Sequence, residues 1–84
     1  MTSEPRLLTV FARDWCTLCD DMIAALAPWR REHGIELDIV FIDDDPELET
    51  RYGTLVPVLT EGDVEICHHF LDAEALRTHL ARSP

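Results

Sequence analysis

Cys16 and Cys19, two of the three cysteines, stand three residues apart where a strand-like segment gives way to a helix-like one. Residues i and i+3 of a helix lie roughly 5–6 Å apart, which is within the Cα separation that a disulfide accepts. A cysteine at the start of a helix faces free N–H groups and the positive end of the helix dipole, and both stabilise a thiolate. Cys19 falls on the apolar face of that helix. The pair is therefore suited to thiol–disulfide exchange, with Cys16 as the nucleophile and Cys19 as the sheltered resolving thiol.

The elements that must position this pair can be predicted from hydrophobic spacing and turn residues. Residues 6–12 are apolar and rich in β-branched or aromatic side chains, which predicts a strand. Residues 16–32 carry an apolar stripe at helical spacing, and Gly34 is a suitable C-terminal cap. Residues 36–42 predict a second strand. Its last four residues form a continuous apolar run, which indicates a strand buried on both faces.

Three further elements complete the chain. Asp45 predicts the N-cap of a short helix that stops at Gly53. Residues 55–60 and 64–67 are short strands joined by a three-residue turn, and Asp72 begins a last helix. The predicted order is βαβαββα, in which the first two strands are parallel and the last two antiparallel. The expected fold class is α/β, with a four-stranded mixed sheet flanked by helices on both faces, in one domain over 1–84.

Composition excludes several classes of partner. The 84 residues include 17 acidic residues and 7 arginines, giving a net charge of −10, and such a surface repels nucleic acid and anionic lipid. No apolar run reaches the length of a membrane span, and the N-terminus lacks the pattern of a secretory signal. We expect a cytoplasmic monomer, in which cysteines serve redox chemistry, metal binding or packing. Asp14, Asp20 and Asp21 crowd the cysteine pair, where their charge opposes the thiolate, unless Asp20 and Asp21 simply complement the helix N-terminus.

These features resemble the thioredoxin superfamily, and most nearly its small bacterial glutaredoxin-like proteins. Trp15-Cys16-x-x-Cys19 is similar to the active-site tryptophan and cysteine pair of thioredoxins, and Val56-Pro57 stands where the superfamily has its cis-proline. The resemblance implies a thioredoxin-like fold and an exchange cycle between Cys16 and Cys19, with Val56 offering its backbone to an extended substrate. Pro57 is then expected to follow a cis peptide bond. Trp15 either contacts the substrate or packs in the core.

The resemblance also implies what the cycle needs. The substrate would be a disulfide-containing protein or a small thiol compound. No bound organic cofactor is implied, but an external thiol reductant, either glutathione or a reductase, must regenerate the dithiol. Glutaredoxins usually carry a Gly-Gly pair after the fourth strand to hold glutathione, whereas this chain has His68-His69. We therefore expect weak glutathione binding, with His69 at the rim of the substrate groove.

A different class of function remains open from the residues alone. The same fold could serve as a non-catalytic binding module, or hold a metal ion through Cys16, Cys19 and either Cys67 or His68. Because the fourth strand runs antiparallel to the third, Cys67 should return to the end of the sheet that carries Cys16. There it either fills space or traps an oxidised form of Cys16.

Overall fold

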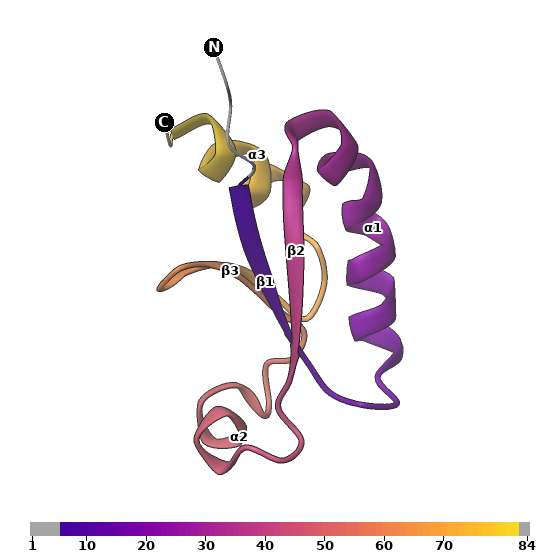
Figure 1. Cartoon of the computed structure of the whole chain (residues 1–84), viewed down its shortest axis with the longest axis vertical. Helices are drawn as coiled ribbons and strands as arrows, with labels where there is room; N and C mark the ends of the chain where they lie inside the picture. The colour runs from indigo at the N-terminus through magenta and orange to yellow at the C-terminus, as the bar shows by residue number, and fades with distance from the viewer. Residues whose placement is uncertain (1–5, 83–84) are drawn as a thin grey trace.

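The computed structural model describes residues 6–82, and it confirms the predicted order of elements (Figure 1). The helices and strands are β1 (Arg6–Ala12), α1 (Thr17–His33), β2 (Ile35–Phe41), α2 (Pro46–Tyr52), β3 (Val58–Glu61), β4 (Val64–His68) and α3 (Ala73–Arg82). Within the described residues, no helix is both long enough and apolar enough to cross a membrane.

The four strands form one mixed sheet in the order β2-β1-β3-β4. β1 and β2 are parallel, whereas β3 runs antiparallel to both β1 and β4. Val58 at the start of β3 lies opposite Phe11 near the end of β1 and opposite His68 at the end of β4. The end of β1, the start of β3 and the end of β4 therefore meet at one end of the sheet, which we call the disulfide end because α1 begins there.

Helices cover both faces of the sheet, but unequally. The main core lies between one face and the helices α1 and α3. Its buried members are Leu8, Val10, Ala12, Cys19, Met22, Leu26, Ile35, Leu59, Cys67 and Leu76. On the other face, Tyr52 of α2 stacks on Phe11 of β1, with 4.3 Å between ring centroids. Figure 1 shows why this second layer is thin: α2 sits at the disulfide end, beyond most of the sheet.

The predicted burial of β2 on both faces is wrong. The apolar run at its end indicated burial on both faces, but Ile39 is 37% exposed and Phe41 is 55% exposed. The reason is that β2 is an edge strand, with a neighbour on one side only. The strand also begins and ends one residue earlier than predicted. Ile42 follows it, is fully buried and donates its N–H to the Ala12 carbonyl.

The predicted caps are confirmed. Gly34 ends α1 in the left-handed conformation, with φ 65°, where glycine has no steric penalty. Asp45 accepts hydrogen bonds from the first turn of α2, and Asp72 accepts one from Ala75 in the first turn of α3. β3 begins at Val58 rather than at residue 55, because residues 53–57 form a turn whose last peptide bond is cis.

Candidate active site

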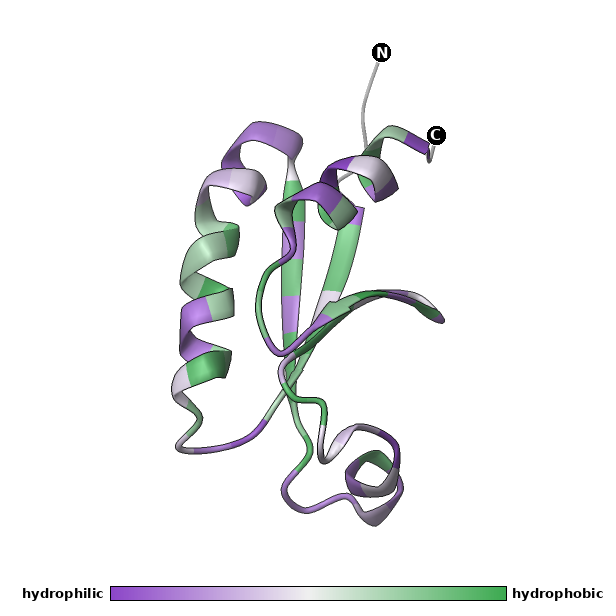
Figure 2. Cartoon of the chain, turned by 180° about the vertical axis from the view of Figure 1, so that it is seen from behind, coloured by the Kyte–Doolittle hydropathy of each residue, from purple (hydrophilic) through white to green (hydrophobic). Residues whose placement is uncertain are grey.

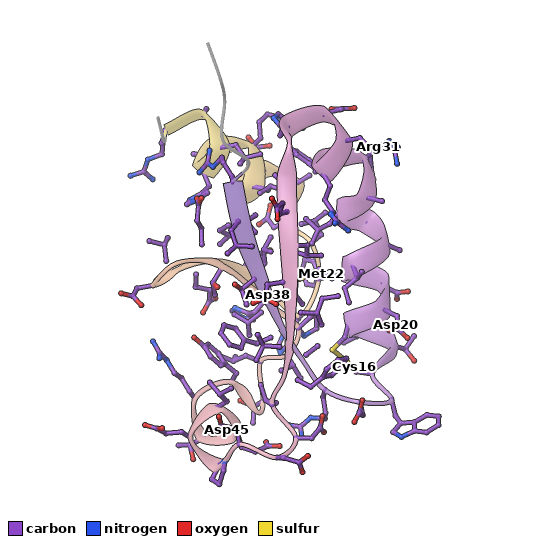
Figure 3. All side chains as sticks on the ribbon, in the orientation of Figure 1. Cys16, Asp20, Met22, Arg31, Asp38 and Asp45 are labelled. Carbon is purple, nitrogen blue, oxygen red and sulfur yellow. A yellow bond between two sulfur atoms is a disulfide. The ribbon has the colours of Figure 1, made fainter. Side chains whose placement is uncertain are left out.

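Cys16 and Cys19 form a disulfide at the start of α1, with a Cα–Cα distance of 5.2 Å (Figure 3). Cys16 is the N-cap of the helix and has an extended backbone, while Cys19 is already in the first turn. The backbone N–H of Cys19 points at Sγ of Cys16, 3.1 Å away. After reduction this donor would face the Cys16 thiolate, and a hydrogen bond to the charged form stabilises that form.

The two sulfurs differ in their access to solvent. Cys19 is 2% exposed and belongs to the core, together with Met22 and Leu26 on the same helical face. Cys16 is only partly buried. In Figure 3 the Met22 side chain points from α1 toward the sheet, which is the direction that shelters this face of the helix. A disulfide or thiol arriving from solvent can therefore reach Cys16 and not Cys19, as the helical spacing predicts.

The sequence left open whether Trp15 packs in the core. Its side chain is fully exposed, at 102% of the reference area, so a place in the core is wrong. Its φ of 60° lies in the left-handed region, which a bulky residue seldom occupies. Such a conformation persists where the surrounding structure fixes it, and it is common at functional sites. The chain thus turns at Trp15 and presents an uncovered indole directly before Cys16.

Arg13 holds the loop that leads to Cys16. Its guanidinium donates to both carboxylate oxygens of Glu49 in α2, at 2.6 and 2.8 Å, and to the Gly53 carbonyl at 2.9 Å. The next residue, Asp14, donates its N–H to the Asp43 carboxylate at 3.0 Å. We call the contacts of Arg13 with Glu49 and Gly53 the Arg13 clamp. The ion pair raises the pKa of Arg13 and lowers the pKa of Glu49, in each case chiefly through the hydrogen bond between them.

The peptide bond between Val56 and Pro57 is cis, as expected. His69 stabilises the loop that carries this bond. The His69 N–H donates to the Pro57 carbonyl at 2.8 Å, and its Nε2 lies 2.9 Å from the Thr54 carbonyl. The Val56 N–H is engaged by the Tyr52 carbonyl at 3.1 Å. Among the described residues the Val56 carbonyl accepts no hydrogen bond, so it is free to accept one.

Cys67 returns to the disulfide end of the sheet, as predicted, but its side chain is buried in the core and is not part of a disulfide. Burial raises the pKa of the Cys67 thiol, which keeps it in the unreactive neutral form. His68 is paired with Glu65, with 2.7 Å between Nδ1 and Oε2. In the part of the chain that the structure describes, no three His, Cys, Asp or Glu side chains are grouped as a metal site requires.

Known proteins share the sequence pattern and the fold of this chain. The family model of the glutaredoxin-like domain (DUF836) matches residues 7–81. The chain belongs to this glutaredoxin-like family. A solution structure of a protein from Nitrosomonas europaea is 37% identical to it, with a TM-score of 0.83, over 94% of this chain and 95% of that one. A crystal structure of a protein from X. campestris is 42% identical, with a TM-score of 0.74, over 92% of this chain and 99% of that one.

More distant structures show the fold of this glutaredoxin-like domain. The thioredoxin of Fasciola hepatica is 20% identical, with a TM-score of 0.61, over 96% of this chain and 84% of that one. The predicted thioredoxin-like α/β fold is therefore confirmed. No curated protein matches the chain significantly.

The Arg13 clamp is the part of the site that the sequence did not reveal. Arg13 looks in the sequence like a free cation close to Cys16, yet its charge is directed at Glu49. Its partners lie 36 and 40 residues away, and no local spacing rule connects residues that far apart.

Proposed function

We propose that this protein is a thiol–disulfide oxidoreductase that works through Cys16 and Cys19. The observation that carries the proposal is the unequal placement of the two sulfurs: Cys16 is the partly exposed N-cap of α1, and Cys19 is buried one turn later. Structural disulfides do not need one sulfur open to solvent beside a fully exposed tryptophan. Exchange does need it, because the attacking thiolate must reach the substrate while the resolving thiol is protected.

The reduced protein would begin the cycle. The Cys16 thiolate attacks one sulfur of the substrate disulfide, and a mixed disulfide forms while the other substrate sulfur leaves as a thiolate and takes up a proton. Cys19 then loses its proton and attacks Sγ of Cys16. The Cys16–Cys19 disulfide forms, and the second substrate sulfur leaves as a thiol. Two electrons pass from the protein to the substrate, and an external thiol or dithiol reductant returns them.

Four neighbouring residues are assigned to substrate binding in this proposal: Trp15, Val56, Pro57 and His69. Trp15 supplies an apolar contact beside the reacting sulfur. The Val56 carbonyl accepts a hydrogen bond from an extended substrate, and His69 fixes the loop of Val56 and Pro57. A bulky imidazole with φ 70° replaces the bare backbone that would hold glutathione, so we expect glutathione to be a poor reductant. A cytoplasmic location, with a reductase as electron donor, fits these features.

Cysteine variants test the proposal. Reduction of a disulfide peptide by dithiothreitol is followed with the wild type and with Cys16→Ser, Cys19→Ser and Cys67→Ala. We expect Cys16→Ser to abolish acceleration and Cys19→Ser to accumulate a mixed disulfide on Cys16, visible by mass spectrometry. Cys67→Ala, the matched control, should retain the wild-type rate within about twofold, because the Cys67 thiol is buried and neutral. Equal rates with and without Cys16 would reject exchange and favour the non-catalytic binding module.

A further inference from the structure

The surface beside the disulfide is apolar and open. Trp15 and Leu18, on either side of Cys16 in the chain, are 102% and 51% exposed. Phe41 is 55% exposed and lies in register with Ala12, whose side chain faces the core, so Phe41 is on the face of the sheet that carries α1. It is also the last residue of β2 at the disulfide end. We call Trp15, Leu18 and Phe41 the apolar rim; isolated large side chains need no explanation, but three near one reactive sulfur indicate a docking surface.

Negative charge surrounds this rim. The segments 13–21 and 43–51, which meet at the disulfide end, carry eight acidic residues and only two arginines. One of those arginines, Arg13, is already paired with Glu49. Figure 2 shows α2 and the loop before it in predominantly hydrophilic colours beside the disulfide end. Among the described residues, five exposed acids at this end have no side-chain hydrogen bond or ion pair: Asp14, Asp20, Asp21, Asp44 and Glu47.

Positive charge is concentrated at the opposite end. Five of the seven arginines occur at the start of β1, at the end of α1 and in α3: Arg6, Arg30, Arg31, Arg77 and Arg82. In Figure 3, Asp20 lies near Cys16 and Arg31 lies at the far end of the same helix. A helix of 17 residues is roughly 25 Å long. That is more than twice the screening length of about 8–10 Å in physiological salt, so these cations do not offset the negative field at Cys16.

We propose that the apolar rim docks a segment of a substrate protein in which lysines or arginines flank the reactive cysteine and an apolar side chain lies next to it. This inference rests on the proposed exchange function and names its substrate class. The charge decides the occupant: a second copy of this chain, with its own net charge of −10, is repelled, as are nucleic acid and anionic thiols such as glutathione. A basic segment is attracted, and the apolar neighbour covers the indole of Trp15.

The test compares three synthetic peptides with the same cyclic disulfide and the same adjacent leucine, flanked by four lysines, four serines or four glutamates. Oxidation of the pre-reduced protein is timed in single turnovers. At 20 mM ionic strength we expect the lysine peptide to react at least about tenfold faster than the glutamate peptide. The ratio should fall below about threefold in 0.5 M NaCl, because exposed charges are then screened.

Variants show which charges are responsible. Asp20→Asn with Asp21→Asn should reduce the lysine-to-glutamate ratio at least about threefold, and the ratio cancels any change in the reactivity of Cys16 itself. The matched control, Asp63→Asn with Glu74→Gln, removes two exposed acids far from the disulfide end and should leave the ratio unchanged. Trp15→Ala should slow all leucine-containing peptides by a similar factor, because it removes apolar contact rather than charge.

Two further measurements separate this inference from the proposed function. Hydroxyethyl disulfide is small and neutral, so its reduction reports exchange chemistry without peptide docking. A lysine peptide with serines in place of both cysteines is titrated against the oxidised protein in a Trp29→Phe background, so that Trp15 alone supplies the fluorescence signal. Binding that is tighter than that of its glutamate counterpart supports the docking surface even where turnover fails. A ratio of about one at low salt, together with equal binding of the two non-reactive peptides, overturns the inference while leaving exchange of the neutral disulfide intact.

Discussion

Two arginine–glutamate pairs of similar geometry stabilise opposite ends of the molecule. At the disulfide end, Arg13 joins the end of β1 to Glu49 of α2 through the clamp described above. At the other end, Arg6 at the start of β1 donates to both oxygens of Glu61, at 3.2 and 2.5 Å. His79 of α3 lies 2.6 Å from the same carboxylate. We call this second group the Arg6 cluster.

The difference between the two pairs lies in what else holds the elements that they join. α3 is anchored to the core by Leu76, which is fully buried, so the Arg6 cluster supports a helix that is already packed. α2 has no buried residue at all. Apart from the stacking of Tyr52 on Phe11, its position depends on the contact of Glu49 with Arg13, in the loop before Cys16. The Arg13–Glu49 pair should therefore mainly maintain the geometry of the site. The Arg6–Glu61 pair should mainly contribute to the free energy of unfolding.

Gly53→Ala should have the largest effect. A Cβ at this position would lie 2.6 Å from Oε1 of Glu49 and 3.4 Å from Nη2 of Arg13, and closer still to the Glu49 backbone carbonyl. The clamp would have to open, and small displacements of reacting groups can slow a reaction about 100-fold. Single-turnover exchange measures the loss. The matched control is Gly62→Ala, whose Cβ would meet nothing within 4 Å; it should lower stability through its left-handed φ and leave exchange unchanged.

Arg13→Ala should have the next largest effect, because it removes the clamp without forcing atoms together. We expect exchange to slow about tenfold, since the loop before Cys16 loses its bond to α2. Glu49→Ala should have a similar effect, and the double variant should be no slower than either single one, which is the signature of residues that act as a pair. Arg82→Ala, at an exposed arginine of α3, serves as the control for lost positive charge. Additive losses in the double variant would contradict a shared role.

A feature of this site could be predicted from the sequence when the residues that determine it are close together in the chain. The caps at Gly34, Asp45 and Asp72 are local, because they involve residues within one helical turn, and all were predicted correctly. The position of Cys67 followed from strand direction alone. The cis bond before Pro57 came from resemblance to a family, since an X–Pro bond by itself is cis in only about 5–6% of cases.

Other features depend on contacts that no local pattern encodes. The exposure of Ile39 and Phe41 follows from the edge position of β2, and an apolar run in an edge strand is indistinguishable from one in a central strand. Trp15 lies in a turn, where hydrophobic periodicity does not apply. The partner of Arg13 lies 36 residues away. In each case the missing information was which distant segment lies beside the residue.

Arg6→Ala tests the opposite end. It removes both bonds to Glu61 and a third to the Leu80 carbonyl, at 3.2 Å. We expect the free energy of unfolding to fall by about 1 kcal/mol, because hydrogen bonds to charged groups contribute this much when they are partly shielded from water. Exchange should stay within about twofold of the wild type, since Leu76 still anchors α3. Urea unfolding measures the first quantity. A loss of exchange comparable with that of Arg13→Ala would show that the two ends are not separable.

The smallest expected effect is the loss of folding stability at acidic pH, when Glu61 becomes protonated. The hydrogen bond from Arg6, with a smaller contribution from His79, lowers the pKa of Glu61 below its ordinary value, although partial burial opposes the shift. A carboxyl group whose pKa is lowered by folding stabilises the folded state at pH values above its unfolded pKa, which is about 4.3. That stabilisation is lost as the pH falls through the folded-state pKa. Two proteins that both carry His79→Gln are therefore compared, one with Glu61 and one with Glu61→Gln, so that Arg6 is the remaining partner of the carboxylate.

Above pH 5 the two proteins should differ in free energy of unfolding by a constant amount below about 1 kcal/mol, since the pair is partly exposed. The difference should shrink as the pH falls from 5 toward 3. Glu49 is also shifted downward, by Arg13, but it is present in both proteins and cancels in the comparison. Urea unfolding at half-unit steps of pH gives the curve. A difference that stays constant down to pH 3 would show that folding leaves the pKa of Glu61 unchanged, and that the Arg6 cluster does not make stability sensitive to acid.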